Sequence, residues 1–224
     1  MTFFVLTLFP DLIQKFADTS IIKKGIEKNK YRVVVKDIRD HAINRYNKVD
    51  DEVYGGGAGM LIRPEPVYDA FKSIDEDSLN NRKVVYFSPK GKILDHKYII
   101  DLTNFENIVL ICGHYEGVDQ RVIDLIVDEQ VSIGDFVLTG GEIPAMALID
   151  GVARQLDGVI NQASLSDESF SNGLLEYRQY TRPYEFMGIK VPEVLVSGHH
   201  ENIKNYKRED SINETKKYRP DLFK

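Results

Sequence analysis

Apolar and polar positions follow two different periods along the first 160 residues. Six short apolar runs predict β-strands, at 3–9, 31–37, 84–88, 107–112, 129–133 and 136–138. Helical periodicity predicts α-helices near 11–28, from Pro64 onward, at 95–103, at 118–127 and at 142–156. The runs at 84–88 and 107–112 are almost wholly apolar, as the central strands of a parallel sheet are. Strands that alternate with helices in this way predict an α/β fold with a parallel sheet.

The pattern changes after residue 160. Residues 161–175 open with NQASLSDESFSNG, which is poor in apolar residues and rich in Ser, Asn and Asp. Such a composition predicts a linker, and a plain tether between domains is its simplest interpretation. Helical periodicity returns around 200–217. The sequence therefore predicts a domain over 1–160, a flexible linker over 161–175 and a small helical domain over 176–224.

Length and cysteine content point to an intracellular protein. A chain of 224 residues can bury a core without disulfides, and its single cysteine, Cys112, cannot form an internal one. The opening MTFFVLTLFPDL has no basic segment and reaches Pro10 too early for a signal peptide. Every apolar run is too short to span a bilayer. We therefore expect a cytoplasmic protein without a membrane segment.

Charge is distributed unevenly along the chain. The formal net charge of −6 argues weakly against a nucleic-acid partner. However, residues 1–175 hold 19 Lys and Arg against 27 Asp and Glu, whereas residues 176–224 hold 10 against 8. Because local patches set such binding, the last part of the chain is where phosphate contacts are expected.

Several common catalytic motifs are absent from the sequence. There is no GxGxxG after a strand, no GxxxxGK[ST], no GxSxG and no HExxH, and the five histidines lack metal-ligand spacing. The sequence therefore argues against a dinucleotide-binding protein, a P-loop nucleotide-binding protein, a serine hydrolase and a zinc enzyme. We assign no metal ligand.

Glycine instead marks the ends of consecutive predicted strands, in the turns 88–91, 112–117, 133–134 and 139–141. In open α/β sheets ligands bind beyond the carboxyl ends of strands, and glycine lets main-chain groups approach them closely. A single glycine of this kind is explained by the end of a strand. Four such turns together favour a pocket lined by main chain, although they do not identify its ligand. A second cluster, Gly55 to Gly59, is either a flexible turn or a backbone nest for an anion or a base edge.

Three long segments carry a resemblance to a known family. CGHYEGVDQRV (112–122), SIGDFVLTGGEIPAMALID (132–150) and GLLEYRQYTRP (173–183) resemble the bacterial tRNA (guanine-N1)-methyltransferases of the SPOUT class. The resemblance extends from the first strand through YGGGAGM (54–60) to YRPDL (218–222). Members methylate the guanine immediately 3′ of the anticodon, position 37 of tRNA.

The resemblance implies a fold and a cofactor. Members of this family are homodimers whose N-terminal α/β domain contains a deep trefoil knot, an exception to the usual rules of chain connection. S-adenosylmethionine binds in the knot, and methyl transfer has also been linked to magnesium. The residues that match the cofactor site are Tyr86, Ser88, Pro89, Gly113, Tyr115, Glu116, Gly117, Ile133, Gly134, Leu138, Gly140, Gly141 and Pro144.

The resemblance also implies an RNA site that both subunits share. The glycine loop, with Gly55, Gly56, Gly57, Gly59 and Met60, approaches the target guanine. The linker is disordered until RNA binds, and the C-terminal domain grips the tRNA anticodon stem-loop.

Two residues match the family's catalytic positions. Without the resemblance, Arg154 would be interpreted as part of a surface ion pair. The resemblance matches it to a catalytic arginine that stabilises negative charge on the purine. Glu168 stands where the family has an Asp as general base for the N1 proton, and Asp167 is the second candidate. Two further departures are Ala58 and Arg178, at positions where the family usually has Pro.

Two alternative functions stay open. The change from Asp to Glu at position 168 is compatible with a homologue that binds RNA but has lost catalysis. A SPOUT methyltransferase that acts on another RNA site is the second alternative, although the glycine loop and the segment 173–183 argue against it.

Overall fold

The structure is a computed structural model that describes residues 1–42, 47–161 and 165–223. The chain divides into two compact units, Met1–Ile160 and Asn161–Lys224, and each is described here by itself. Within the described residues, no helix is both long and apolar enough to cross a membrane.

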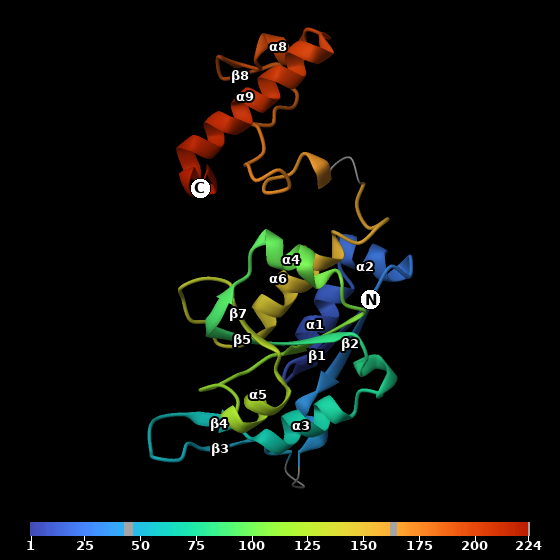
Figure 1. Cartoon of the computed structure of the whole chain (residues 1–224), viewed down its shortest axis with the longest axis vertical. Helices are drawn as coiled ribbons and strands as arrows, with labels where there is room; N and C mark the ends of the chain where they lie inside the picture. The colour runs from blue at the N-terminus through green and yellow to red at the C-terminus, as the bar shows by residue number, and fades with distance from the viewer. Residues whose placement is uncertain (43–46, 162–164, 224) are drawn as a thin grey trace. The chain divides into compact units, whose positions relative to one another are not determined.

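A five-stranded sheet forms the centre of the first unit (Figure 1). Its strands are β1 (Thr2–Thr7), β2 (Arg32–Asp37), β5 (Arg82–Ile93), β6 (Asn107–Ile111) and β7 (Glu129–Ser132), in the order β2-β1-β6-β5-β7. All four neighbouring pairs are parallel. The predicted α/β fold with a parallel sheet is therefore confirmed. A short antiparallel pair, β3 (Asp50–Glu52) with β4 (Met60–Ile62), lies outside this sheet.

Helices cover both faces of the sheet (Figure 1). One face packs against α1 (Pro10–Ala17), α2 (Ser20–Glu27), α4 (His96–Leu102) and α6 (Glu142–Ala153). The other packs against α3 (Pro64–Lys72), α5 (Gln120–Ile126) and the 3-10 turn η1 (Ile38–His41). A second 3-10 turn, η2, spans Asp77–Leu79.

Successive side chains of β1 point to opposite faces of the sheet, and both faces are buried. Phe3 and Val5 enter one core and Phe4 and Leu6 the other, all at most 5% exposed. Burying each such side chain contributes roughly 1.5–3 kcal/mol.

Three predicted elements differ from the structure. The helix expected over 11–28 is two helices, because Asp18, Thr19 and Ser20 prefer caps and turns to helix interiors. The run 136–138 is not a strand: it forms a loop in which Val137 is 84% exposed. The helix expected over 142–156 ends at Ala153, before the Asp157–Gly158 turn, in which Gly158 has φ +80°.

The second unit is built around one long helix, α9 (His200–Tyr218), as the periodicity around 200–217 predicted. A two-residue hairpin, β8 (Glu185–Phe186) with β9 (Ile189–Lys190), and the short helix α8 (Glu193–Val196) precede it. The 3-10 turn η3 (Pro220–Phe223) follows it. Residues 167–174 form hydrogen-bonded turns, and Leu175 is tied to α9 through Ser211 and Thr215.

Candidate active site

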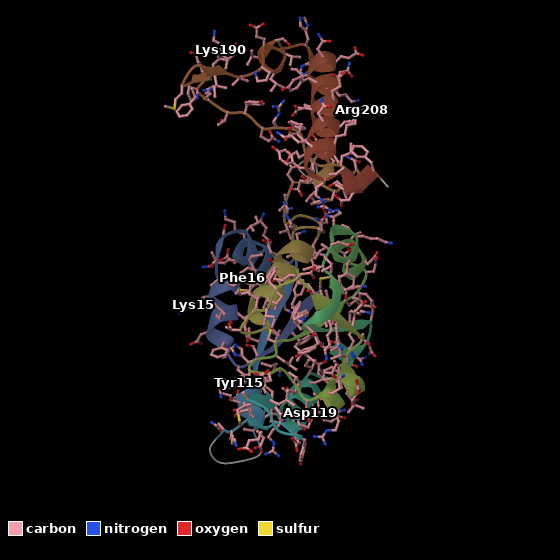
Figure 2. The ribbon with its side chains drawn as sticks, turned by 90° about the vertical axis from the view of Figure 1, so that its left-hand side faces the viewer. Lys15, Phe16, Tyr115, Asp119, Lys190 and Arg208 are labelled. Atoms are coloured by element: carbon pink, nitrogen blue, oxygen red, sulfur yellow. The ribbon has the colours of Figure 1, made fainter. Side chains whose placement is uncertain are left out.

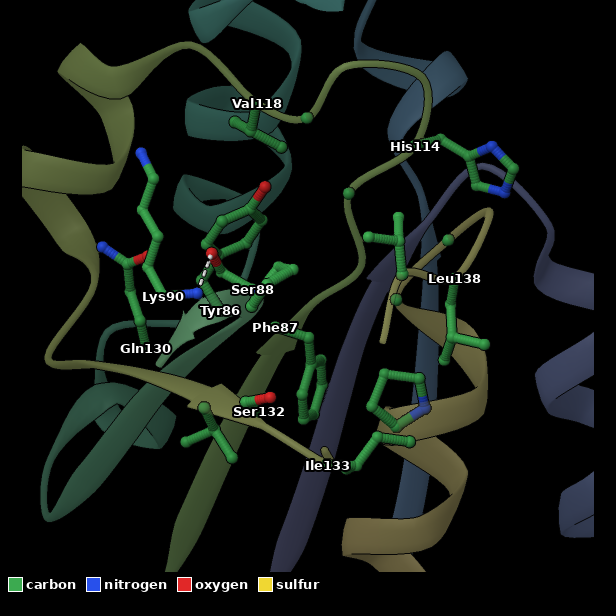
Figure 3. A pocket seen from close by; sticks show the side chains of 18 of the residues that line it. Tyr86, Phe87, Ser88, Lys90, His114, Val118, Gln130, Ser132, Ile133 and Leu138 are labelled. Atoms are coloured by element: carbon green, nitrogen blue, oxygen red, sulfur yellow. Dashed lines mark hydrogen bonds between the residues drawn. The ribbon is translucent and has the colours of Figure 1, made fainter. Parts of the chain in front are cut away.

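A cavity of about 370 Å³ opens at the carboxyl ends of β5, β6 and β7 (Figure 3). Its walls come from four segments: the end of β5, the loop after β6, the end of β7 and the loop into α6. All thirteen residues that the resemblance assigned to the cofactor line this one cavity. They are Tyr86, Ser88, Pro89, Gly113, Tyr115, Glu116, Gly117, Ile133, Gly134, Leu138, Gly140, Gly141 and Pro144.

A bulge in β5 forms one wall of the cavity. The pairing of β5 with β7 shifts between Phe87 and Lys92, so the residues between them leave the regular ladder. The backbone N–H of Lys90 donates to the hydroxyl of Ser88 at 3.2 Å, the bond drawn in Figure 3. The bulge therefore turns the Ser88–Pro89 main chain toward the cavity instead of toward the next strand.

Close main-chain contacts form the opposite wall. The N–H of Gly141 donates to the carbonyl of Gly113 at 2.9 Å, and a Cβ at Gly141 would stand 2.7 Å from the Cα of Cys112. Gly117 has φ +115°, which disfavours other residues. Beneath these loops lies Tyr86, whose phenol pKa is raised by burial. The sequence therefore needs glycine here for the shape of the cavity wall.

A buried carboxyl group joins three segments behind this wall. Glu142, the first residue of α6, is 3% exposed and accepts a hydrogen bond of 2.7 Å from the hydroxyl of Thr7. Nε2 of His114 lies 3.7 Å from its other oxygen, and the His114 ring packs on Phe9. His114 lies at the edge of the cavity in Figure 3, and its contacts with Glu142 and Phe9 support the wall there. Burial, with Glu142 nearby, raises the pKa of Cys112.

We expect the Thr7→Val variant to be less stable than the wild type by about 1–3 kcal/mol, because it leaves a buried acceptor short of a partner. The hydroxyl of Thr7 also accepts from the N–H of Phe9, so that donor loses its partner too. Urea denaturation measures the free energy of unfolding. Thr103→Val is the matched control, since its hydroxyl bonds the carbonyl of Ile100 at the surface and its loss costs at most about 0.5 kcal/mol. Equal effects in the two variants would contradict a role for Thr7 in the buried cluster.

The glycine-rich loop connects β3 to β4 and reaches the rim of the cavity at one end. The N–H of Glu116 donates to the carbonyl of Met60 at 3.0 Å, and a Cβ at Gly59 would meet the Glu116 side chain at 2.5 Å. The N–H of Asp119, which is labelled in Figure 2 with Tyr115, donates to the carbonyl of Ile62 in β4 at 3.0 Å. Gly55, Gly56 and Gly57 have positive φ and, among the described residues, no atom lies within 4 Å of their Cβ positions. The structure thus brings Gly59 and Met60 against Glu116, which lines the cavity, and leaves the other three exposed.

The two candidate catalytic residues lie in different units. Arg154 is the half-buried C-cap of α6, whose first turn, with Pro144, lines the cavity. Arg154 follows Pro144 by ten positions, which corresponds to about 15 Å along the helix axis. Glu168 lies in a turn of the second unit, where its carbonyl accepts from the N–H of Ser171 at 3.2 Å. Asp167 precedes it in the same turn.

Some residues of the cavity were not among those predicted from the sequence. Ser132 ends β7 and faces the cavity (Figure 3), and strand ends were already the expected place for such a residue. Phe136 and Thr139 also line the cavity, although the apolar run 136–138 predicted a strand. Across the described residues, no cluster of three or more His, Cys, Asp or Glu could hold a metal ion.

The sequence is similar to a single enzyme family over its whole length. The profile of the tRNA (Guanine-1)-methyltransferase TrmD family matches residues 1–224. A tRNA (guanine-N(1)-)-methyltransferase of Clostridioides difficile is 49% identical, covering 100% of this chain and 98% of the relative. Proteins of the same name from Ruminiclostridium cellulolyticum and Borrelia garinii are each 50% identical over 100% of this chain, covering 96% and 93% of their own lengths. Because similarity of this strength leaves no part of the sequence unmatched, the chain belongs to the tRNA (Guanine-1)-methyltransferase family.

Proposed function

We propose that this protein transfers a methyl group from S-adenosylmethionine to N1 of the guanine immediately 3′ of the anticodon, position 37, in tRNA. The observation that carries the proposal is the convergence of thirteen residues, far apart in sequence, on one cavity at the strand ends. The family relationship supports the substrate, since the relatives are named tRNA (guanine-N(1)-)-methyltransferases. We assign the reaction to the cytoplasm, where tRNA is found.

The cavity suits S-adenosylmethionine in size and in chemistry. Its volume of about 370 Å³ is in the range of small-molecule sites. Gly113, Gly117 and Gly141 let the main chain form the wall of the cavity where a Cβ would collide with Tyr86 or Cys112. Leu138 and Phe87 add apolar surface beside them (Figure 3). Once bound, the cofactor supplies an electrophilic methyl group.

Residues of the protein must remove the N1 proton of the guanine and stabilise the charge that results. N1 carries a proton and is a poor nucleophile until that proton leaves, so Glu168 acts as the general base. Negative charge then develops toward O6, and the guanidinium of Arg154 stabilises it. Alignment of the nucleophile with the methyl group contributes the remainder of the rate enhancement.

A homodimer explains two features of the first unit. Apolar side chains stand exposed beside the cavity, including Phe9 at 43%, Phe136 at 53% and Val137 at 84%. Arg154 lies at the far end of α6 from the cavity of its own chain, at a distance of about 15 Å. Burying the apolar surface against a second copy, and using Arg154 in that copy's site, accounts for both. The family relationship further supports a deep trefoil knot within residues 1–160.

The second unit is the proposed tRNA-binding part. Its long helix α9 carries Lys204, Lys207, Arg208, Lys216 and Lys217 (Arg208 is labelled in Figure 2), and residues 176–224 hold 10 Lys and Arg against 8 Asp and Glu. Phosphates of an anticodon stem-loop are bound by such groups. This assignment agrees with the expectation from charge distribution.

We expect the wild-type protein to sediment as a dimer at micromolar concentration. Val137→Glu should shift it toward monomer and lower methyl transfer, because the new charge would lie in the buried interface. Leu125→Glu is the control: this α5 residue is 67% exposed, and its substitution should leave the dimer intact. A fully active wild-type monomer in analytical ultracentrifugation would contradict the shared site.

The experiment that tests the proposed function is methylation of tRNA transcripts with G or A at position 37. Mass spectrometry of the digested product then identifies the methylated atom. N1-methylguanine at that position supports the proposal, whereas methylation at another RNA site favours the second alternative. Cofactor binding without transfer to any transcript would indicate an RNA-binding homologue.

A further inference from the structure

Residues 175–178 are hydrogen-bonded to α9 at two places. At the first, the N–H of Leu175 donates to the hydroxyl of Thr215 at 2.9 Å, and the hydroxyl of Ser211 donates to the carbonyl of Leu175. Thr215 is fully buried and in turn donates to the carbonyl of Ser211. These bonds fix the chain at Leu175.

The second place is an ion pair with unusually complete geometry. The backbone N–H of Arg178 donates to Oδ2 of Asp210 at 2.8 Å, and its Nε and Nη2 donate to the same carboxylate. Asp210 is 4% exposed, while Glu214 one turn later lies 3.6 Å from Nε of Arg178. Consistent with these bonds, the Arg178 guanidinium lowers the pKa of the Asp210 carboxyl. A buried carboxylate is thus satisfied by the main chain and side chain of one residue.

This pairing depends on a residue that departs from the family pattern. Position 178 usually holds Pro in the family that the sequence resembles, and proline has neither a backbone N–H nor a charge. Proline restrains the chain through its ring, whereas Arg178 restrains it through three bonds to α9. The clamp is therefore specific to sequences with this pair.

Residues 175–178, which the bonds to α9 hold in place, directly follow the turn that contains Glu168. The N–H of Glu176 donates to the hydroxyl of Ser169 at 3.0 Å, and the N–H of Phe170 donates to the carbonyl of Leu174 at 2.7 Å. From the end of α9, the guanidinium of Arg219 lies 5.6 Å from the centre of the Phe170 ring. Ser169, the neighbour of Glu168 in the chain, is thus hydrogen-bonded to Glu176, which lies two residues before Arg178.

We propose that Arg178 and Asp210 are positioning residues, which hold the Glu168 turn on α9 so that its carboxylate is presented to the guanine in one geometry. The proposal rests on the proposed function in taking Glu168 as the base. Misplacing a reacting group by about 1 Å can cost on the order of 100-fold in rate. The pair therefore contributes to turnover without contacting substrate.

The test is a double-mutant cycle with Arg178→Ala, Asp210→Ala and both together, with Arg178→Lys as the conservative variant. We expect each alanine variant to lower the single-turnover rate at saturating tRNA and cofactor by about 10- to 100-fold. Affinity for S-adenosylmethionine should stay at the wild-type value. The double variant should be no slower than the slower single one, since both remove the same interaction. Arg178→Lys should recover part of the rate.

A second measurement does not depend on activity. Amide hydrogen exchange of residues 169–178 should speed up in Arg178→Ala, while exchange in α9 stays slow at temperatures well below unfolding. Lys23→Ala, which breaks an exposed ion pair with Glu27 in the first unit, is the control and should change neither rate nor exchange.

These readouts separate the two proposals. Unchanged exchange over 169–178 in Arg178→Ala overturns the clamp, whatever the activity. Faster exchange with a wild-type single-turnover rate overturns the positioning role. If the wild type methylates no tRNA, the proposed function fails, and exchange alone decides whether the clamp exists.

Discussion

Glu168→Gln should lower the single-turnover rate of tRNA methylation by about 100- to 10,000-fold, the usual range for loss of a general base. Glutamine keeps the shape of the side chain but cannot accept the N1 proton as a carboxylate does. Binding of S-adenosylmethionine should survive, because the cavity belongs to the first unit and Glu168 to the second. Rapid-quench kinetics and isothermal titration measure the two quantities separately.

Two further variants test which carboxylate is the base. Glu168→Asp should retain or raise activity, since it restores the residue that the family resemblance predicts at this position. Asp167→Asn should have little effect, although it lies next to Glu168 in the same turn. A severe loss in Asp167→Asn beside a nearly normal Glu168→Gln would assign the proton to Asp167 instead.

The location of the cavity could be predicted because it depends on local sequence. The glycine turns 112–117 and 133–134 directly follow the apolar strands β6 and β7, and parallel strands end at the same edge of a sheet. Gly113 and Gly134 are therefore expected near each other from the strand pattern, and they do line one cavity, which Gly141 joins although it follows a loop. Their ligand was not predictable from glycine alone, and only the resemblance named it.

Contacts between distant segments could not be predicted in the same way. Thr7 and Glu142 are 135 residues apart, and no periodicity links them. The pair of Arg178 and Asp210, 32 residues apart, leaves no local signal either. The apolar run 136–138 wrongly predicted a strand for another reason: Phe136 and Val137 are exposed at the cavity rim, so burial within the chain does not explain their apolar character.

Arg154→Ala should lower turnover by about 100- to 1,000-fold, equivalent to roughly 3–4 kcal/mol of lost transition-state stabilisation. The guanidinium is proposed to act on charge that develops during transfer, so affinity for the cofactor should change little. Arg154→Lys keeps the charge without the planar fork and should recover only part of the rate. An unchanged single-turnover rate in Arg154→Ala would remove it from the mechanism.

The position of Arg154 on α6 makes a sharper prediction about which cavity it serves. A mixed dimer is formed from Arg154→Ala and Leu138→Trp, the latter chosen because the half-buried Leu138 lines the cavity and a larger side chain there narrows it. If Arg154 acts on the partner's cavity, one of the two sites in this dimer combines an intact cavity with an intact arginine. Mixing two inactive variants should then restore activity, up to about half that of the wild type for the mixed species. If Arg154 acts within its own chain, both sites stay defective and mixing restores nothing. The axial distance of about 15 Å between Pro144 and Arg154 favours the first outcome, because an arginine side chain is too short to return along the helix to its own cavity.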